Sequence, residues 1–184
     1  LELIGRESSG YNALLRQLSD QIQDPFLSAI IVGKYHRAME LKTQLELDPE
    51  SWMSNIGHSS RSEKIVTILG NLIENALEAS ASEEGQKKVS LSMTDVGNEL
   101  IFEVEDSGSG ISEEQQKTIF DEGFSTKTGT GRGIGLQLVQ KNLIQLDGHL
   151  TIGESSLGGA RFTAYIPKTI INGESNEHPG PDRG

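Results

Sequence analysis

Three short stretches decide the fold of this chain: Asn71-Leu72-Ile73-Glu74-Asn75-Ala76-Leu77-Glu78-Ala79, Asp106-Ser107-Gly108-Ser109-Gly110 and Gly131-Arg132-Gly133-Ile134-Gly135-Leu136. They combine two asparagines one helical turn apart, a carboxylate beside a glycine turn, and a second glycine run that opens a helix. Each stretch alone is weak evidence, because short glycine motifs occur often by chance. Their order and spacing along a single chain predict a nucleotide-binding site.

The composition excludes several other classes of protein. The chain has 184 residues, enough for one domain with a core and a peripheral segment. A net charge of −11 argues against nucleic acid or an anionic membrane surface as a partner. There is no cysteine, so neither a disulfide nor a thiolate metal site is available. No apolar run approaches the ~18 residues that a membrane-spanning helix needs.

Hydrophobic periodicity predicts alternating helices and strands. Gly5 and Gly10 are expected to break residues 1–20, with a helix only from Tyr11. The other expected helices begin after Asp24-Pro25, at Ser60, after Ser112 and at Gly133, and the expected strands are 43–47, 89–94, 100–105, 150–152 and 160–166. Tight hairpins among these elements favour an α+β protein, a two-layer α/β sandwich, over a doubly wound sheet.

Several residues predict where the helices begin and end. Asp24 is expected to cap the second helix, whose buried face would comprise Phe26, Leu27, Ile30 and Ile31. Ser60 and Glu63 match a capping box, and Gly148 is expected to close the last helix.

Asn71 and Asn75 lie at the edge of the apolar stripe of the helix that begins at Ser60, with Glu74 and Glu78 on its polar side. Asparagine oxygens are suitable ligands for Mg²⁺, which prefers oxygen and keeps several waters. The alternative is that both asparagines are ordinary solvated helix residues.

Asp106 continues the inward-facing row of its strand, where an unpaired carboxylate is costly to bury. Gly108 and Gly110 would let the backbone approach a flat ligand closely, and an adenine amine could supply the donor that Asp106 lacks. An ordinary Asp-Ser-Gly turn leaving a strand remains the alternative.

The run Gly131, Gly133 and Gly135 opens a helix, where backbone N–H groups bind anions. Lys127 and Arg132 are the nearest cations for phosphate. The run follows a loop rather than a strand, which argues against a dinucleotide-binding fold, and it lacks the ending of a P-loop.

Together these motifs resemble the GHKL ATP-binding superfamily, and within it the catalytic domain of bacterial sensor histidine kinases. Residues 71–75 resemble the N box, 106–110 the first glycine box, Phe120 and Phe124 the F box, 131–136 the second glycine box and 158–162 a looser last box. The resemblance covers residues from about 25 to 167. Residues 34–38, residues 70–79 and the short lid look most like the citrate and dicarboxylate sensor kinases.

The resemblance implies a Bergerat-type fold, with a mixed sheet covered on one face by helices, and two cofactors, ATP and Mg²⁺. It implies that Asn75 binds the metal, that Asn71 acts with it near the phosphates, that Asp106 recognises adenine, and that residues 124–132 form a lid. The residues expected to contact the nucleotide are Asn75, Asp106, Gly108, Gly110, Phe124, Lys127, Thr128, Arg132, Gly133, Gly135 and Leu136.

The same resemblance implies that residues 1–20 are the end of a dimerisation-hairpin helix or a linker, 21–170 the catalytic domain and 171–184 a disordered tail. The implied partners are the protein's own dimerisation domain and a response regulator. The longer protein is expected to be a membrane-anchored homodimer, with this domain in the cytoplasm.

Three features depart from the family pattern. Glu78 stands where many relatives have a basic residue, and Gly123 stands where a second aromatic is common. No histidine has the acidic residue directly after it that marks the phosphoacceptor, since the four are followed by Arg37, Ser59, Leu150 and Pro179. The acceptor is therefore expected outside this chain, and His36 is expected to be structural.

Three other functions stay open. A GHKL-type ATPase would use a glutamate to activate water, but this chain has Asn71 in that place, and an amide does not take up a proton. Glu74 is a possible substitute base on a different side of the helix. An anti-sigma-type serine kinase shares these motifs, and a regulatory binding module without turnover would keep them in part.

Overall fold

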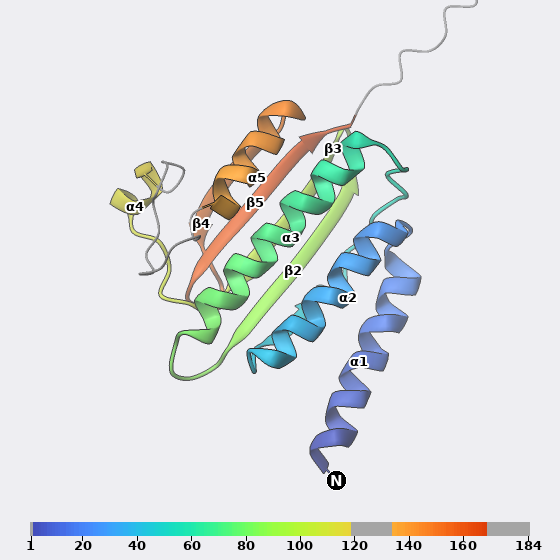
Figure 1. The fold of residues 1–184 in the computed structure, drawn as a ribbon, viewed down its shortest axis with the longest axis vertical. Helices are drawn as coiled ribbons and strands as arrows, with labels where there is room; N and C mark the ends of the chain where they lie inside the picture. Colours follow the sequence, from blue (N-terminus) through green and yellow to red (C-terminus); the bar gives the residue numbers. More distant parts are fainter. Residues whose placement is uncertain (1, 119–133, 169–184) are drawn as a thin grey trace, which may run out of the picture.

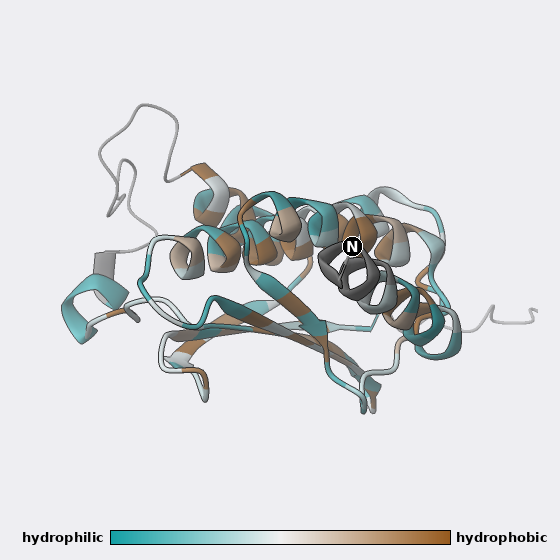
Figure 2. Cartoon of the chain, turned by 90° about the horizontal axis from the view of Figure 1, so that it is seen from below, coloured by the Kyte–Doolittle hydropathy of each residue, from teal (hydrophilic) through white to brown (hydrophobic). Residues whose placement is uncertain are grey.

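A mixed sheet forms one layer of the molecule and helices form the other (Figures 1 and 2). The computed structural model describes residues 2–118 and 134–168. Its helices are α1 (Glu2–Gln21), α2 (Pro25–Glu40), α3 (Ser60–Ala81), α4 (Glu113–Thr118) and α5 (Ile134–Gln145). Its strands are β1 (Gln44–Leu47), β2 (Lys88–Val96), β3 (Glu99–Asp106), β4 (His149–Glu154) and β5 (Ala160–Pro167).

The five strands lie in the order β1-β2-β3-β5-β4. Strand β1 runs parallel to β2, and all other neighbours are antiparallel. Figure 2 shows α2, α3 and α5 on one face of this sheet, with no described helix on the other face. The predicted two-layer α+β sandwich with a mixed sheet covered on one face is therefore confirmed.

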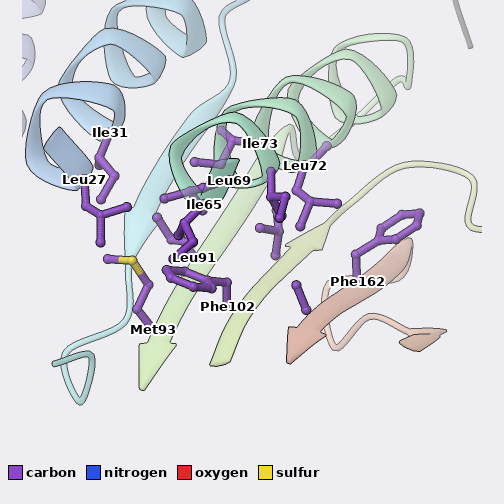
Figure 3. Close-up of a cluster of buried hydrophobic side chains, with 14 of the residues drawn as sticks. Leu27, Ile31, Ile65, Leu69, Leu72, Ile73, Leu91, Met93, Phe102 and Phe162 are labelled. Atoms are coloured by element: carbon purple, nitrogen blue, oxygen red, sulfur yellow. The ribbon is translucent and has the colours of Figure 1, made fainter. Parts of the chain in front are cut away.

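The core lies between the helices and the covered face of the sheet (Figure 3). Strands β2 and β3 alternate buried and half-buried side chains along their length, so one face of each packs against α3. The buried side chains labelled in Figure 3 are Leu27, Ile31, Ile65, Leu69, Leu72, Ile73, Leu91, Met93, Phe102 and Phe162. This packing fixes the rotation of α3, and with it the direction of its polar residues.

The expected break at Gly5 and Gly10 is wrong, because α1 is continuous from Glu2 to Gln21. A Cβ at position 10 would stand 2.9 Å from Tyr35 Oη, so this glycine allows α1 to approach α2 closely. Leu14 and Leu18 of α1 are buried in the same core. Tertiary packing thus offsets the ~1 kcal/mol that a glycine costs within a helix.

Two helix-start predictions have different outcomes. Asp24 caps α2 as expected, since its Oδ1 accepts from the N–H groups of Phe26 and Leu27 at 2.9 Å. The capping box of α3 lies one residue earlier than predicted: the Ser59 hydroxyl accepts from Ser62 N–H, and the Ser62 hydroxyl accepts from Ser59 N–H. A serine at the third helical position therefore takes the place of the expected glutamate.

Phe26 does not join the buried face of α2, because its side chain is 44% exposed and stacks on His58 with ring centroids 4.9 Å apart. Gly148 does close α5, since its N–H donates to the Leu143 carbonyl at 2.8 Å. The left-handed residue, however, is Asp147, with φ 55°. Gly148 is needed for space instead, because a Cβ there would stand 2.6 Å from the Tyr165 carbonyl oxygen.

Residues 119–133 and 169–184 lie outside the described residues. The predicted F box, the lid of residues 124–132 and the tail of residues 171–184 therefore remain predictions. Within residues 2–118 and 134–168, no helix has both the length and the apolar character that crossing a bilayer requires.

Candidate functional site

The two asparagines of α3 face the first turn of α5. The nearest atoms to a Cβ built on Gly135 are Asn71 Oδ1 at 3.0 Å and Asn75 Oδ1 at 3.6 Å. Asn71 Nδ2 donates to the Thr67 carbonyl at 2.7 Å, which turns the oxygen of this amide toward α5. Two amide oxygens therefore converge on Gly135, where a larger side chain would crowd Asn71 Oδ1.

Asn75 brings unused hydrogen-bonding capacity to the same place. Its Nδ2 is buried and has no hydrogen-bond partner among the described residues. Most buried polar atoms are paired, because an unpaired one costs about 1–3 kcal/mol. Such an atom beside two converging oxygens is typical of a site that a ligand completes.

Glu74 lies on a different side of α3 from the two asparagines. Its carboxylate accepts hydrogen bonds from Lys34 Nζ at 2.6 Å and from Arg37 Nε at 3.1 Å, both on α2. Burial raises the pKa of Glu74, but these hydrogen bonds and the charges of Lys34 and Arg37 outweigh burial and hold it below 4.5. Glu74 therefore lies on a polar side of α3, as expected, and its ion pairs join α3 to α2.

Asp106 ends β3 on the covered face of the sheet and is 3% exposed. Its Oδ1 accepts from Gly108 N–H at 2.8 Å and from Ala160 N–H at 3.1 Å. No hydrogen bond from the described residues reaches its other oxygen, Oδ2. One oxygen thus fixes the carboxylate, and the other remains able to accept a hydrogen bond from a ligand.

Burial raises the pKa of Asp106 above 3.8, although the hydrogen bonds from Ala160 and Gly108 lower it in part. The charge of neighbouring Glu105 raises it further. A carboxylate kept in so apolar a place at the end of a strand costs stability, which is common at functional sites.

Glycines form the surroundings of Asp106. A Cβ on Gly159 would stand 2.1 Å from Asp106 Oδ1, and a Cβ on Gly108 would stand 2.9 Å from Ala79 Cβ. Gly110 has φ +76°, a left-handed conformation that favours glycine. Gly108 and Gly159 therefore allow neighbouring atoms to approach closely, and Gly110 allows the backbone conformation of the turn.

One face of α3 connects the two halves of the site. Asn71, Asn75 and Ala79 are spaced four residues apart, so they lie one above another with a rise of about 6 Å between successive members. Asn71 and Asn75 face Gly135 of α5, and Ala79 contacts Gly108 of the turn after Asp106. The amide oxygens and the turn that follows the buried carboxylate therefore lie along the same side of α3, as parts of one candidate site.

The structure brings together most of the predicted residues that it describes. Asn71, Asn75 and Gly135 form one group, Asp106, Gly108 and Gly110 form another, and Leu136 packs against the core. The other predicted contacts lie outside the described residues: Phe124, Lys127, Thr128, Arg132 and Gly133.

Gly159 is the residue that sequence reasoning undervalued. Among the sequence motifs it falls only within the looser last box, 158–162, yet in the structure its N–H donates to the Asp106 carbonyl at 3.1 Å. The signal was the Gly158-Gly159 pair directly before β5, but no spacing rule links it to a carboxylate 53 positions earlier in the sequence.

A family model described as "Histidine kinase-, DNA gyrase B-, and HSP90-like ATPase" matches residues 60–170, more than half of the chain. The chain belongs to this family. The matched residues contain all of the asparagine, aspartate and glycine positions of the site. The GHKL resemblance predicted from the motifs is therefore confirmed.

Within this ATPase family, similar proteins are sensor kinases. The chain is 45% identical over 150 residues to the Sensor protein CitS of Halalkalibacterium halodurans, covering 81% of this chain and 28% of that protein. It is 32% identical over 181 residues to the Sensor histidine kinase CitA of Klebsiella pneumoniae, covering 98% of this chain and 32% of that protein.

A solved structure of the catalytic domain of histidine kinase ThkA is also similar, with a TM-score of 0.62 and 25% identity over 78% of this chain and 90% of that one. The predicted resemblance to sensor histidine kinase catalytic domains, and among them to the citrate and dicarboxylate sensor kinases, is confirmed. The chain spans only about a third of the length of these sensor kinases.

Proposed function

We propose that this chain holds Mg–ATP and presents the γ-phosphate to a histidine on a dimerisation domain outside residues 1–184. The observation that carries the proposal is the convergence of Asn71 Oδ1 and Asn75 Oδ1 on Gly135, on the helix face that also reaches the Asp106 turn. This arrangement offers hard oxygen ligands at one end and a single buried acceptor at the other.

The donor set fits the two cofactors. Amide oxygens and few protein ligands suit Mg²⁺, and the residue assigned to the metal is Asn75, with Asn71 beside it toward the phosphates. When bound, the metal would neutralise phosphate charge as the phosphoryl group leaves. Gly133 and Gly135 would let phosphates approach the N-terminus of α5, with Lys127 and Arg132 as the nearest cations.

Asp106 is assigned to adenine. Its Oδ1 is fixed by two backbone N–H groups, so Oδ2 is the oxygen that would accept from the exocyclic amine. Guanine presents a carbonyl oxygen at the corresponding position, and two acceptors facing each other repel. The buried carboxylate therefore favours ATP over GTP.

The chain's part in phosphoryl transfer is positioning, because this reaction depends mainly on alignment and charge neutralisation. Efficient hydrolysis of ATP by the domain itself is not expected. Asn71 takes the place of a glutamate base, and Glu74 is held by Lys34 and Arg37 away from the asparagines. The expected partners are therefore the domain that carries the acceptor histidine and a response regulator downstream.

The test uses the longer protein that carries this chain and its acceptor, with γ-labelled ATP and Mg²⁺. Protein-bound label and free phosphate are counted in the same tube. We expect acid-labile, base-stable label on a histidine outside residues 1–184, and little free phosphate. Fast phosphate release without bound label would indicate that the chain is a hydrolytic member of the family. Acid-stable label on serine would indicate a serine kinase.

A further inference from the structure

The turn between β4 and β5, residues 155–159, is held from both faces of the sheet by two neighbouring residues of β3. Adjacent residues of a strand point to opposite faces, so Glu105 lies on the uncovered face and Asp106 on the covered one. Glu105 uses a carboxylate oxygen to bind the turn, and Asp106 uses one to bind Ala160, the residue that follows the turn.

On the covered face, Asp106 binds the end of the turn. Gly159 N–H donates to the Asp106 carbonyl at 3.1 Å, and Ala160 N–H donates to Asp106 Oδ1 at 3.1 Å. A Cβ on Gly159 would stand only 2.1 Å from the same Oδ1. The position of the carboxylate therefore depends on where the turn lies, together with the hydrogen bond from Gly108 N–H at 2.8 Å.

On the uncovered face, Glu105 binds the start of the turn through one oxygen. Its Oε2 accepts from Ser155 Oγ at 3.0 Å, from Ser156 N–H at 2.7 Å and from Ser156 Oγ at 2.7 Å. Burial raises the pKa of Glu105, but the hydrogen bonds from Ser156 and Ser155 outweigh burial and lower it below 4.5. The carboxylate is thus charged at neutral pH, and its hydrogen bonds are of the stronger, charge-assisted kind.

Hydrogen bonds within the turn link its first residue to its last two. Ser155 N–H donates to the Gly159 carbonyl at 2.9 Å, and Gly158 N–H donates to the Ser155 carbonyl at 3.1 Å. Gly158 has φ +99°, which closes the turn. A shift of Ser155 would therefore move Gly159 and the adjoining Ala160, whose N–H donates to Asp106 Oδ1.

We infer that Glu105 is a positioning residue for nucleotide selection, because it anchors the 155–159 turn that orients the Asp106 carboxylate. This inference rests on the proposed function, in which Asp106 recognises adenine. Glu105 itself points to the uncovered face and is not expected to touch the nucleotide.

Glu103 provides a matched control. It lies two residues earlier on the same face of β3, and its Oε2 accepts from Thr163 Oγ1 at 2.9 Å and lies 3.9 Å from Arg161 Nε. These partners belong to strand β5 rather than to the turn. Removing Glu103 thus disturbs the same sheet face and removes the same charge without releasing residues 155–159.

The experiment measures equilibrium affinities of the full chain for ATP and for GTP, with Mg²⁺, in Glu105→Ala, Glu105→Gln, Glu103→Ala and Asp106→Asn. Glu105→Ala is expected to lower the affinity for ATP about tenfold and to change the affinity for GTP less than about twofold. Tenfold is the lower end of the loss in affinity when a metal ligand loses its outer hydrogen-bond partner. Glu105→Gln should fall between wild type and alanine, and Glu103→Ala should keep the wild-type preference.

A second measurement follows backbone amide hydrogen exchange at Gly159 and Ala160. The inference predicts faster exchange in Glu105→Ala than in Glu103→Ala, because the turn is released. If Glu105→Ala lowers the affinities for ATP and GTP equally, or changes neither affinity, the inference is overturned. If instead Asp106→Asn leaves the ATP-over-GTP preference intact, the adenine assignment in the proposed function fails first.

Discussion

The two ends of the site are built in opposite ways. At the Asp106 end, backbone N–H groups and close-packed glycines already occupy one carboxylate oxygen and fix its direction. At the asparagine end, a buried amide nitrogen of Asn75 has no partner among the described residues, and two oxygens converge on a glycine. The carboxylate of the first end is thus oriented by the fold itself, whereas the second end keeps an unpaired donor among the described residues.

In the proposed function, this difference gives the two ends separate tasks. A preformed acceptor discriminates between bases, because a wrong base meets a carboxylate that does not move. Incomplete coordination suits a hydrated metal and a phosphate chain, because these bring their own waters and oxygens. The following variants separate the two ends, from the largest expected effect to the smallest.

Asn75→Ala should have the largest effect, because it removes the assigned metal ligand. We expect ATP affinity measured with Mg²⁺ to fall about 100-fold, since loss of even an outer partner of a metal ligand costs about 10–100-fold in metal affinity. Affinity measured in a metal chelator should change little, which serves as the internal control. A variant that keeps its full Mg²⁺ dependence would remove Asn75 from the metal site.

Gly159→Ala tests whether the Asp106 end is close-packed. The new Cβ would meet backbone atoms of Asp106 and Gly108 at 2.6 Å, so the turn must shift. We expect a loss of roughly 2 kcal/mol in the free energy of unfolding, as is usual for overpacking, measured by urea denaturation. Gly153→Ala is the control, because its Cβ would meet only the side chain of Arg161 at 3.4 Å.

Asp106→Asn sharpens the assignment of adenine. Two N–H groups hold Oδ1, so the amide oxygen should stay there and the new NH₂ group should replace Oδ2. A donor would then face the adenine amine and would suit a guanine carbonyl. We expect ATP affinity to fall at least about tenfold and GTP affinity to rise, since hydrogen bonds to charged groups contribute about 1.5–3 kcal/mol. Competition binding with both nucleotides measures the ratio.

Glu74→Gln tests whether Glu74, on the side of α3 that faces α2, takes part in ATP hydrolysis. The change removes the charge that Lys34 and Arg37 bind, and we expect the Lys34–Glu74 pair to contribute less than about 1 kcal/mol of stability. Because its folded pKa is lowered, this contribution is present above pH 4.5 and is lost as the pH falls through the folded pKa. Phosphate release should stay negligible in the variant and in wild type. A wild-type release rate that Glu74→Gln abolishes would instead make Glu74 a base.

The smallest effect concerns the stability of Asp106→Asn without nucleotide. Because burial raises the folded pKa of Asp106, its favourable contribution is complete below the ordinary pKa of 3.8 and is lost as the pH rises through the folded pKa. The variant should therefore melt slightly higher than wild type at pH 7, and the gain should vanish at low pH. A lower melting temperature at neutral pH would show that the carboxylate stabilises the empty domain.

Sequence reasoning succeeded where one element carries its own signal. The apolar stripe of α3 predicted which face is buried and therefore that Asn71 and Asn75 share an edge, because helical periodicity is local. Strand alternation likewise predicted that Asp106 points toward the covered face. The helix from residue 2 was missed, because the contact of Gly10 with Tyr35 that favours it lies 25 residues away along the chain.

The sequence by itself determined the two-layer fold, the family and the order of the site residues, because periodicity and motif spacing are properties of neighbouring positions. Only the tertiary structure decided which residues meet between elements: Gly159 with Asp106 and Glu105 with Ser156 at the edge of the sheet, and Glu74 with Lys34 between α3 and α2. These pairs depend on strand register and helix packing, which bring together residues 40 to 53 positions apart, and no local pattern encodes such contacts.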